Sequence, residues 1–363
     1  MSAFYTTSRV TNLARFVWDR RFRATYPVRP RYYPASVAVE VTTRCNLRCT
    51  RCERRVVPPQ ELNHDTSMAV VEGVLPILRY ANSVTLVGGL GEPFMNKRFW
   101  DIHRAVASTG ARVTFITNGL LMTDEHIERC LDERTHSIFF SVDSTDSAIY
   151  ERLKLGTNTD HVWGVIARLI EARRRRGRHQ PEIVINYAFQ TDTIDGMPDM
   201  IALARKVGVD RIWFTGVITH DAENVPYSFF NMDLDAVKRK LAAAQRKADE
   251  AGMRIRLPRT DPFDRPAVCC HPFDEMFVFY QGDVVACPHF RAPRTYYFHV
   301  DGGRVVQRKV DYPHLVMGNV LRENVLDIWN NADYVRLRRW CKEHNADPAM
   351  APCNTCYYAH GWH

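Results

Sequence analysis

The chain has 363 residues, of which 45% are hydrophobic, and a formal net charge of +8. It can bury one large core or two smaller ones. No apolar run approaches the roughly 18 residues of a membrane span, and residues 1–31 lack the apolar segment of a signal peptide. The ten cysteines are clustered, which indicates metal ligation rather than disulfides. We therefore expect a cytoplasmic protein with no membrane partner.

Short β-branched segments alternate with amphipathic helical patterns from residue 36 onward. The predicted strands are residues 36–41, 83–87, 112–116, 137–142, 183–189 and 211–215. The helical patterns between them are residues 68–80, 98–108, 124–131, 161–175 and 197–207. Such alternation implies a parallel sheet with right-handed crossovers. We therefore expect an α/β fold, a (βα)6 partial TIM barrel over residues 36–258, after an N-terminal extension over residues 1–35.

Three cysteines follow the first predicted strand at the spacing C-x3-C-x2-C: Cys45, Cys49 and Cys52. Three thiolates at this spacing can hold three irons of a [4Fe–4S] cluster and leave the fourth iron open. An open position is the mark of a catalytic metal site. A zinc site or a redox pair is the alternative; zinc needs a fourth ligand, for which His64 is the nearest candidate.

Polar and glycine residues follow the next three strands, where barrel enzymes place their chemistry. Residues 88–93 read Gly-Gly-Leu-Gly-Glu-Pro, and glycines let a backbone approach a ligand closely. Residues 117–119 read Thr-Asn-Gly. Ser141 and Asp143 are two residues apart, so we expect their side chains to share one face. Each of these segments is also compatible with an ordinary turn.

The run of arginines at residues 173–176 and 178 ends a predicted helix, where cations suit the helix dipole. We expect a solvated helix end rather than a nucleic-acid patch, because no RNA- or DNA-binding signature accompanies the run.

A second cysteine group lies in the last hundred residues. Residues 233–252 predict a helix, residues 253–257 a strand and residues 258–266 a linker, so we place the domain boundary at 258/259. Residues 276–280 and 284–286 predict a hairpin around Gly282. Four thiolates can then gather, and both zinc and a [4Fe–4S] cluster accept four such ligands. The four would come from Cys269 or Cys270, Cys287, Cys353 and Cys356.

Residues 36–363 resemble the radical S-adenosylmethionine (SAM) superfamily, through the cysteine motif and the Gly-Gly-x-Gly-Glu-Pro segment. The resemblance implies that SAM chelates the open iron and is cleaved to a 5′-deoxyadenosyl radical, with electrons from a donor such as flavodoxin or ferredoxin. Glu92 is implied as a partner of the SAM ammonium group. Lys154 stands where relatives often pair an arginine with the SAM carboxylate, with Arg152 as the alternative. The other residues implied at the SAM site are Gly89, Gly91, Asn118, Ser141 and Asp143.

Residues 259–363 resemble the SPASM or twitch domain of these enzymes, a small α+β iron–sulfur domain. The resemblance implies one auxiliary [4Fe–4S] cluster on Cys269, Cys287, Cys353 and Cys356, and so two clusters in all. Cys270 is the alternative to Cys269. Cys341 and Cys130 are expected in helix interiors; either of them, or Cys270, is the candidate if the reaction needs a thiol hydrogen donor.

We expect an enzyme that abstracts hydrogen from a polar small molecule, a sugar or cyclitol, and oxidises it with the help of the auxiliary cluster. Because only about 35 residues precede the first predicted strand, we expect no leader-binding domain of the kind that peptide modifiers commonly carry. The alternatives are a radical epimerase, a peptide-modifying enzyme and, least favoured, a non-catalytic iron–sulfur or zinc protein.

Overall fold

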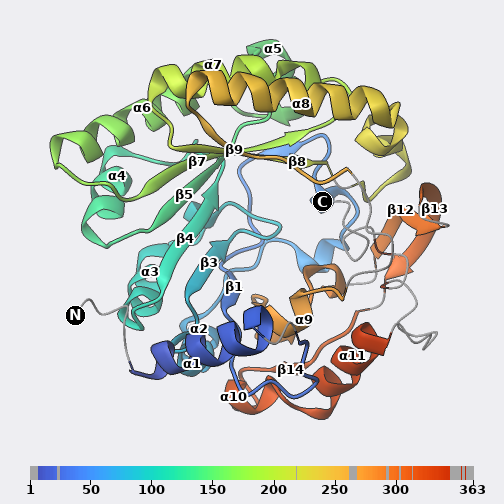
Figure 1. Cartoon of the computed structure of the whole chain (residues 1–363). Helices are drawn as coiled ribbons and strands as arrows, with labels where there is room; N and C mark the ends of the chain where they lie inside the picture. Colours follow the sequence, from blue (N-terminus) through green and yellow to red (C-terminus); the bar gives the residue numbers. More distant parts are fainter. Residues whose placement is uncertain are drawn as a thin grey trace.

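The computed structural model describes residues 7–22, 25–217, 219–260, 268–291, 294–301, 304–312, 314–343, 353 and 356. Its centre is a curved parallel sheet whose six main strands lie side by side in chain order (Figure 1). These are β1 (Ser36–Glu40), β3 (Ser83–Val87), β4 (Arg112–Thr117), β5 (Ser137–Ser141), β7 (Glu182–Phe189) and β8 (Arg211–Gly216). The short β9 (Arg254–Arg256) adds parallel to β8. The predicted (βα)6 partial barrel is confirmed.

Helices cover the outer side of this sheet (Figure 1). They are α2 (Met68–Leu78), α3 (Phe99–Ser108), α4 (Asp124–Asp132), α6 (Thr159–Arg175), α7 (Met197–Val207) and α8 (Leu234–Ala251), each within two residues of its predicted bounds. Alternate strand residues such as Val37 and Val39 are fully buried beneath the helices, whereas Ala38 between them faces a cavity on the inner side. This period of two is what a strand between a core and a site requires.

The C-terminal segment continues the main sheet. Strand β10 (Glu275–Val278) pairs parallel with β1, and β11 (Asp283–Val285) and β14 (Gly318–Asn319) add antiparallel beyond it. Three helices lie near the end of the sheet that contains β1 (Figure 1): α9 (His271–Asp274), α10 (Val325–Ile328) and α11 (Ala332–Glu343). The predicted hairpin is confirmed. The boundary at 258/259 stays a prediction, and most of the predicted linker lies outside the described residues.

Sequence patterns did not indicate several of the elements. A two-stranded hairpin, β12 (Arg294–Asp301) with β13 (Arg304–Tyr312), stands apart from the main sheet. Helix α5 (Ser147–Leu153) leads into β6 (Lys154–Leu155), which pairs with β2 (Arg48–Cys49). Helix α1 (Thr7–Val17) lies in the N-terminal extension.

Helix α1 docks through buried polar side chains. The guanidinium of Arg9 is 1% exposed and donates to Ala81 O at 2.7 Å, Leu78 O at 3.1 Å and Thr109 O at 3.0 Å. These carbonyls lie at or just beyond the ends of α2 and α3, where backbone acceptors lack helical partners and a cation is favourable. A search for apolar periodicity cannot find a helix that docks in this way.

The arginine run at the end of α6 is largely paired within the protein. Arg173 is buried, against the expectation of a solvated end, and binds both carboxylate oxygens of Asp210 at 2.5 and 3.2 Å. Arg176 pairs with Glu128 and Asp132 of α4. These pairs hold α6 against its neighbours, whereas Arg174, Arg175, Arg176 and Arg178 are exposed, as expected of a solvated helix end.

In the part of the chain that the structure describes, none of the helices combines the length and apolarity that a bilayer crossing requires.

A buried ion pair joins the barrel to the C-terminal segment. Glu40, at the end of β1, is paired with Arg291, and the two side chains are 0% and 3% exposed. The carboxylate of Glu40 also accepts the Leu90 N–H at 3.5 Å and the Tyr280 N–H at 3.3 Å. Because a buried carboxylate is costly without partners, this pair fixes three segments relative to one another.

We expect Arg291→Met to lower the free energy of unfolding by about 3–5 kcal/mol, because it leaves Glu40 buried without its counter-charge. The double variant Glu40→Met/Arg291→Met is expected to lose less than Arg291→Met alone, since it leaves no buried charge. Urea unfolding followed by far-UV circular dichroism measures both. Strictly additive losses would show that the two side chains do not act as a pair.

Candidate functional site

The loop that carries Cys45, Cys49 and Cys52 is tied to its surroundings by backbone and hydroxyl bonds. The Thr42 hydroxyl lies 3.0 Å from His64 O and 2.6 Å from Asp65 Oδ1, and the Thr43 N–H donates to His64 O at 2.8 Å. Farther on, β2 pairs antiparallel with β6, which places Cys49 opposite Lys154. The three cysteines are therefore held on a braced loop.

The three thiols line one cavity of about 430 Å³ at the carboxyl ends of the strands. Burial raises the pKa of all three thiols, that of Cys49 to about 12. Buried thiols stay neutral unless a bound cation or metal offsets the thiolate charge. Of the residues predicted at the SAM site, six line the same cavity: Gly89, Gly91, Glu92, Asn118, Ser141 and Lys154.

The glycine turn after β3 lets two backbone segments approach one another. A Cβ on Gly91 would lie 2.5 Å from Arg44 O and 2.6 Å from Thr42 O. Gly89 has φ +57°, and a Cβ there would meet the Glu40 carboxylate at 2.2 Å. Side chains at either position would push the cysteine loop or Glu40 away.

The carboxylate of Glu92 is turned toward the end of β4. It accepts the Thr117 hydroxyl at 2.6 Å and the Asn118 N–H at 2.7 Å. The Asn118 amide in turn donates to Asn46 Oδ1, inside the cysteine loop, at 2.9 Å. Burial raises the pKa of the Glu92 carboxyl to about 7, against these hydrogen bonds. In this structure Glu92 organises the neighbouring turn, and its contact with SAM stays a prediction.

Ser141 and Asp143 play different parts. Ser141 lines the cavity, and its carbonyl accepts Lys154 Nζ at 2.9 Å. The Asp143 carboxylate pairs with Lys154 Nζ at 3.1 Å and accepts the Ala188 N–H at 3.0 Å. Asp143 thus holds Lys154 in place. Arg152 points elsewhere, with its side chain 63% exposed and paired to Asp192.

A second layer covers the cysteine loop, and no sequence motif indicated it. Arg51 binds both carboxylate oxygens of Asp192 at 3.1 Å and lies 3.6 Å over the Tyr227 ring. Asn224, in the short helix Ala222–Tyr227, donates to Thr50 O at 3.4 Å. These contacts connect the loop to the segments after β7 and β8. Only the fold brings those segments to the cysteines.

The C-terminal cysteines gather around a separate small cavity. Its lining includes five of them: Cys269, Cys287, Cys341, Cys353 and Cys356. Cys270 is exposed, and Asp274 and Glu275 are its acidic neighbours. The structure therefore directs Cys269, rather than Cys270, into the cavity. Cys130 is buried in α4, as expected for a helix-core residue.

The two cavities share a wall. Pro288 lines the larger cavity, while its neighbours Cys287, His289 and Phe290 line the smaller one. This segment is a short 3-10 helix, Pro288–Phe290, that follows β11. A group held by Cys287 would therefore lie directly behind the wall of the larger cavity.

The residues present fit iron–sulfur clusters and SAM. Three thiols open into a cavity with glycine backbone on one side, and four or more thiols surround the other cavity. Among the described residues, no three His, Cys, Asp or Glu side chains stand close enough together to hold a single metal ion. His64, the candidate fourth zinc ligand, places its Nε2 2.8 Å from Gln60 O and stacks on Tyr280.

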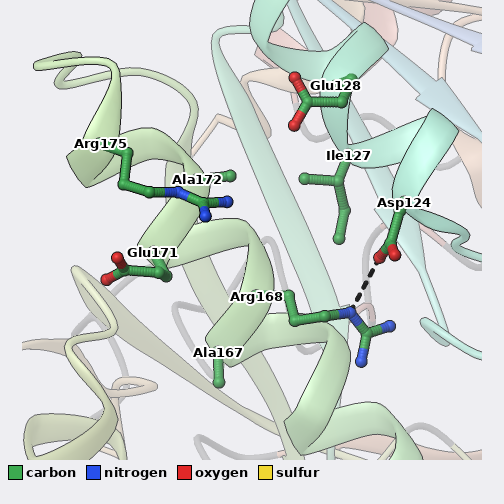
Figure 2. Close-up of a pocket in the computed structure, with 8 residues that line it drawn as sticks. All are labelled: Asp124, Ile127, Glu128, Ala167, Arg168, Glu171, Ala172 and Arg175. Carbon is green, nitrogen blue, oxygen red and sulfur yellow. Dashed lines mark hydrogen bonds and ion pairs between the residues drawn. The ribbon is translucent and has the colours of Figure 1, made fainter.

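Another cavity, of about 530 Å³, lies on the outer surface between α4 and α6 (Figure 2). An ion pair from Arg168 to Asp124 at 2.9 Å crosses it. Its lining is charged helix surface with apolar residues between, and its residues are Asp124, Ile127, Glu128, Ala167, Arg168, Glu171, Ala172 and Arg175. It does not include any of the predicted site residues.

Known proteins share this organisation. Residues 39–204 match the model of the radical SAM superfamily, and residues 269–357 match SPASM, an iron–sulfur cluster-binding domain. The chain is 25% identical over 311 residues to the tungsten-containing aldehyde ferredoxin oxidoreductase cofactor-modifying protein of Pyrococcus furiosus, covering 83% of this chain and 82% of the relative. It is 24% identical over 349 residues to the PqqA peptide cyclase of Streptomyces rochei, covering 91% and 83%.

Among solved structures, SuiB of Streptococcus suis bound to S-adenosylmethionine superposes with a TM-score of 0.64 at 16% identity, covering 90% of this chain and 73% of SuiB. This likeness concerns the fold. The two family models match, in this order, the two segments whose cysteines line the two cavities. The chain therefore belongs to the radical SAM superfamily and carries a C-terminal SPASM iron–sulfur domain.

Proposed function

We propose that this radical SAM enzyme oxidatively modifies a peptide. The observation that carries the oxidation is the shared wall, because Cys287, which lines the cavity of the auxiliary cysteines, directly precedes Pro288, which lines the cavity of the radical site. When bound, SAM and its cluster supply a 5′-deoxyadenosyl radical, and an auxiliary cluster supplies a one-electron acceptor. The peptide class is supported by the similarity to the PqqA peptide cyclase, which extends over 91% of this chain.

In this proposal Cys45, Cys49 and Cys52 hold the SAM-binding cluster, and Lys154 pairs with the SAM carboxylate. Glu92 and Asn118 keep the turn after β4 against the cysteine loop. The layer of Arg51, Asp192 and Tyr227 excludes water from the back of that loop. We also propose that a flavodoxin or ferredoxin reduces the enzyme in the cytoplasm.

Oxidation is preferred over epimerisation because of where the thiols lie. An epimerase of the kind considered above needs a thiol beside the substrate. Among the described residues, the cysteines that line the larger cavity are Cys45, Cys49 and Cys52, all assigned to the cluster. Cys341 faces the other cavity, and Cys130 is buried in α4.

A polar small molecule is the second candidate substrate. The similarity to the Pyrococcus furiosus cofactor-modifying protein over 83% of this chain favours it, as does a cavity of only about 430 Å³. A sugar or cyclitol, the substrate expected from the sequence, stays a prediction within this class.

We expect the triple variant with Cys45, Cys49 and Cys52 changed to Ala to form no 5′-deoxyadenosine. The wild type is expected to hold about eight irons, as two four-iron clusters, and the triple variant about four. Iron analysis and chromatography of SAM products after anaerobic reconstitution measure both. A wild type with four irons and one zinc would contradict the assignment of the C-terminal site.

We expect Lys154→Met to weaken SAM binding roughly 10- to 100-fold, since a charge-assisted hydrogen bond contributes about 1.5–3 kcal/mol. The matched control is Arg152→Met, a cation two residues earlier that points away, and its affinity should stay at the wild-type value. Calorimetric titration of SAM into reconstituted protein gives the dissociation constants. Equal affinities in the two variants would remove Lys154 from the SAM site.

We expect a low-molecular-mass extract of cells that express the protein to stimulate 5′-deoxyadenosine formation, because substrate binding completes the site. Digestion of the extract with a protease, removed before the assay, should abolish the stimulation if the substrate is a peptide. Stimulation that survives digestion would favour the small-molecule candidate. The triple cysteine variant is the control for SAM breakdown unrelated to the enzyme.

A further inference from the structure

The loop that carries the first three cysteines has two sides of different character. Its cavity side presents Cys45, Cys49 and Cys52 to the larger cavity, with Arg54 beside them. Four other arginines of the same loop are not part of that lining: Arg44, Arg48, Arg51 and Arg55. The loop thus holds its sulfurs on the cavity side and most of its cations away from that side.

Two of these arginines form a surface with the segment around β6. Arg48 is exposed and lies opposite Leu155 in the pairing of β2 with β6. The side chain of Arg152 is 63% exposed and pairs with Asp192 at 3.4 Å, and Arg51 pairs with the same carboxylate at 3.1 Å. These contacts gather three guanidinium groups along one stretch of the loop.

Further contacts extend this surface to the short helix Ala222–Tyr227. The guanidinium of Arg51 lies 3.6 Å from the centre of the Tyr227 ring. Arg55 pairs with Glu223 of this helix at 2.9 Å, and its side chain remains 45% exposed. The two halves of the surface therefore meet at Arg51.

Exposed apolar side chains accompany these cations. Val56 follows Arg55 in the chain, and Val56, Leu155 and Tyr227 are all exposed. The other large hydrophobic side chains that are exposed among the described residues are Val10, Trp18 and Leu321. Half of the set is therefore found at this one surface, and an exposed apolar patch with a polar rim is typical of a docking site.

We call this set the arginine surface, and its carboxylates are Asp192 and Glu223. Four arginines against two carboxylates leave the surface positive, and charge of one sign speeds the approach of an oppositely charged partner. The full membership of the arginine surface is Arg48, Arg51, Arg55, Val56, Arg152, Leu155, Asp192, Glu223 and Tyr227.

We propose that the arginine surface docks the acidic one-electron carrier protein, a flavodoxin or ferredoxin, that reduces the enzyme. The inference rests on the electron donor of the proposed function. Arg48 directly precedes Cys49, so a carrier docked here is separated from the three thiols by little more than the loop itself. Because electron transfer slows steeply with distance, this is a short route, and it leaves the cavity to SAM and substrate. The reduced carrier loses one electron and the cluster gains it, and no bond is made or broken in that step.

The test combines Arg48→Gln with Arg55→Gln in the full reconstituted chain and uses an acidic flavodoxin as the probe. We expect the dissociation constant for flavodoxin, from calorimetric titration at low ionic strength, to rise roughly 2- to 30-fold, since two exposed ion pairs are lost. Added salt should bring the wild type and the variant together. Formation of 5′-deoxyadenosine driven by sub-saturating reduced flavodoxin should fall by a similar factor. Formation driven by reduced methyl viologen, a small cation, should stay at the wild-type rate.

Arg174→Gln/Arg175→Gln is the matched control, because it removes two exposed cations at the end of α6, which leads into the start of β7 at the opposite end of the barrel. Its flavodoxin affinity should equal that of the wild type. An equal loss in this control, or an unchanged dissociation constant in Arg48→Gln/Arg55→Gln, would overturn the proposal.

An equal loss of 5′-deoxyadenosine formation with methyl viologen would also overturn it, and would assign the two arginines to the radical site or to an acidic substrate. A wild type that forms no 5′-deoxyadenosine with methyl viologen would refute the proposed function, while the binding titration would still decide the docking surface.

Discussion

The carboxylate of Glu40 is the point on which the two halves of the site depend. It stands at the end of β1, fully buried, and binds Arg291, the glycine turn through Leu90 and the hairpin through Tyr280. A charge so deeply buried is tolerated only with partners in place. Glu40 therefore links β1 to the glycine turn, the hairpin and the segment after Cys287, beside the place where β10 pairs with β1.

The motif residues depend on partners that no motif contains. The cysteine loop is paired through β2 with β6, and Arg51 within it is held by Asp192 from the other side of the barrel mouth. Lys154 is oriented by Asp143, and Asn118 by Glu92. A reactive site needs its groups fixed by such supporting contacts.

The SPASM segment does more than carry cysteines. Through Phe277, Phe279 and Pro288 it forms part of the wall of the larger cavity. Substrate bound there would touch residues of both family domains, with Cys287 immediately behind. The arrangement supports the proposed oxidation, in which the electron acceptor must stand close to the substrate.

The sequence by itself determined the barrel and the two cysteine groups, because strand–helix alternation and thiol spacing are local patterns. It also located the strand ends at which Glu92, Asn118 and Ser141 meet the cysteines. It did not indicate α1, since Arg9 docks through hydrogen bonds rather than an apolar stripe, nor the choice of Cys269 over Cys270. Only the tertiary structure decided that Asp143 holds Lys154 and that Cys341 joins the auxiliary cysteines. Such contacts join residues distant in the chain, and their geometry is set by packing rather than by spacing.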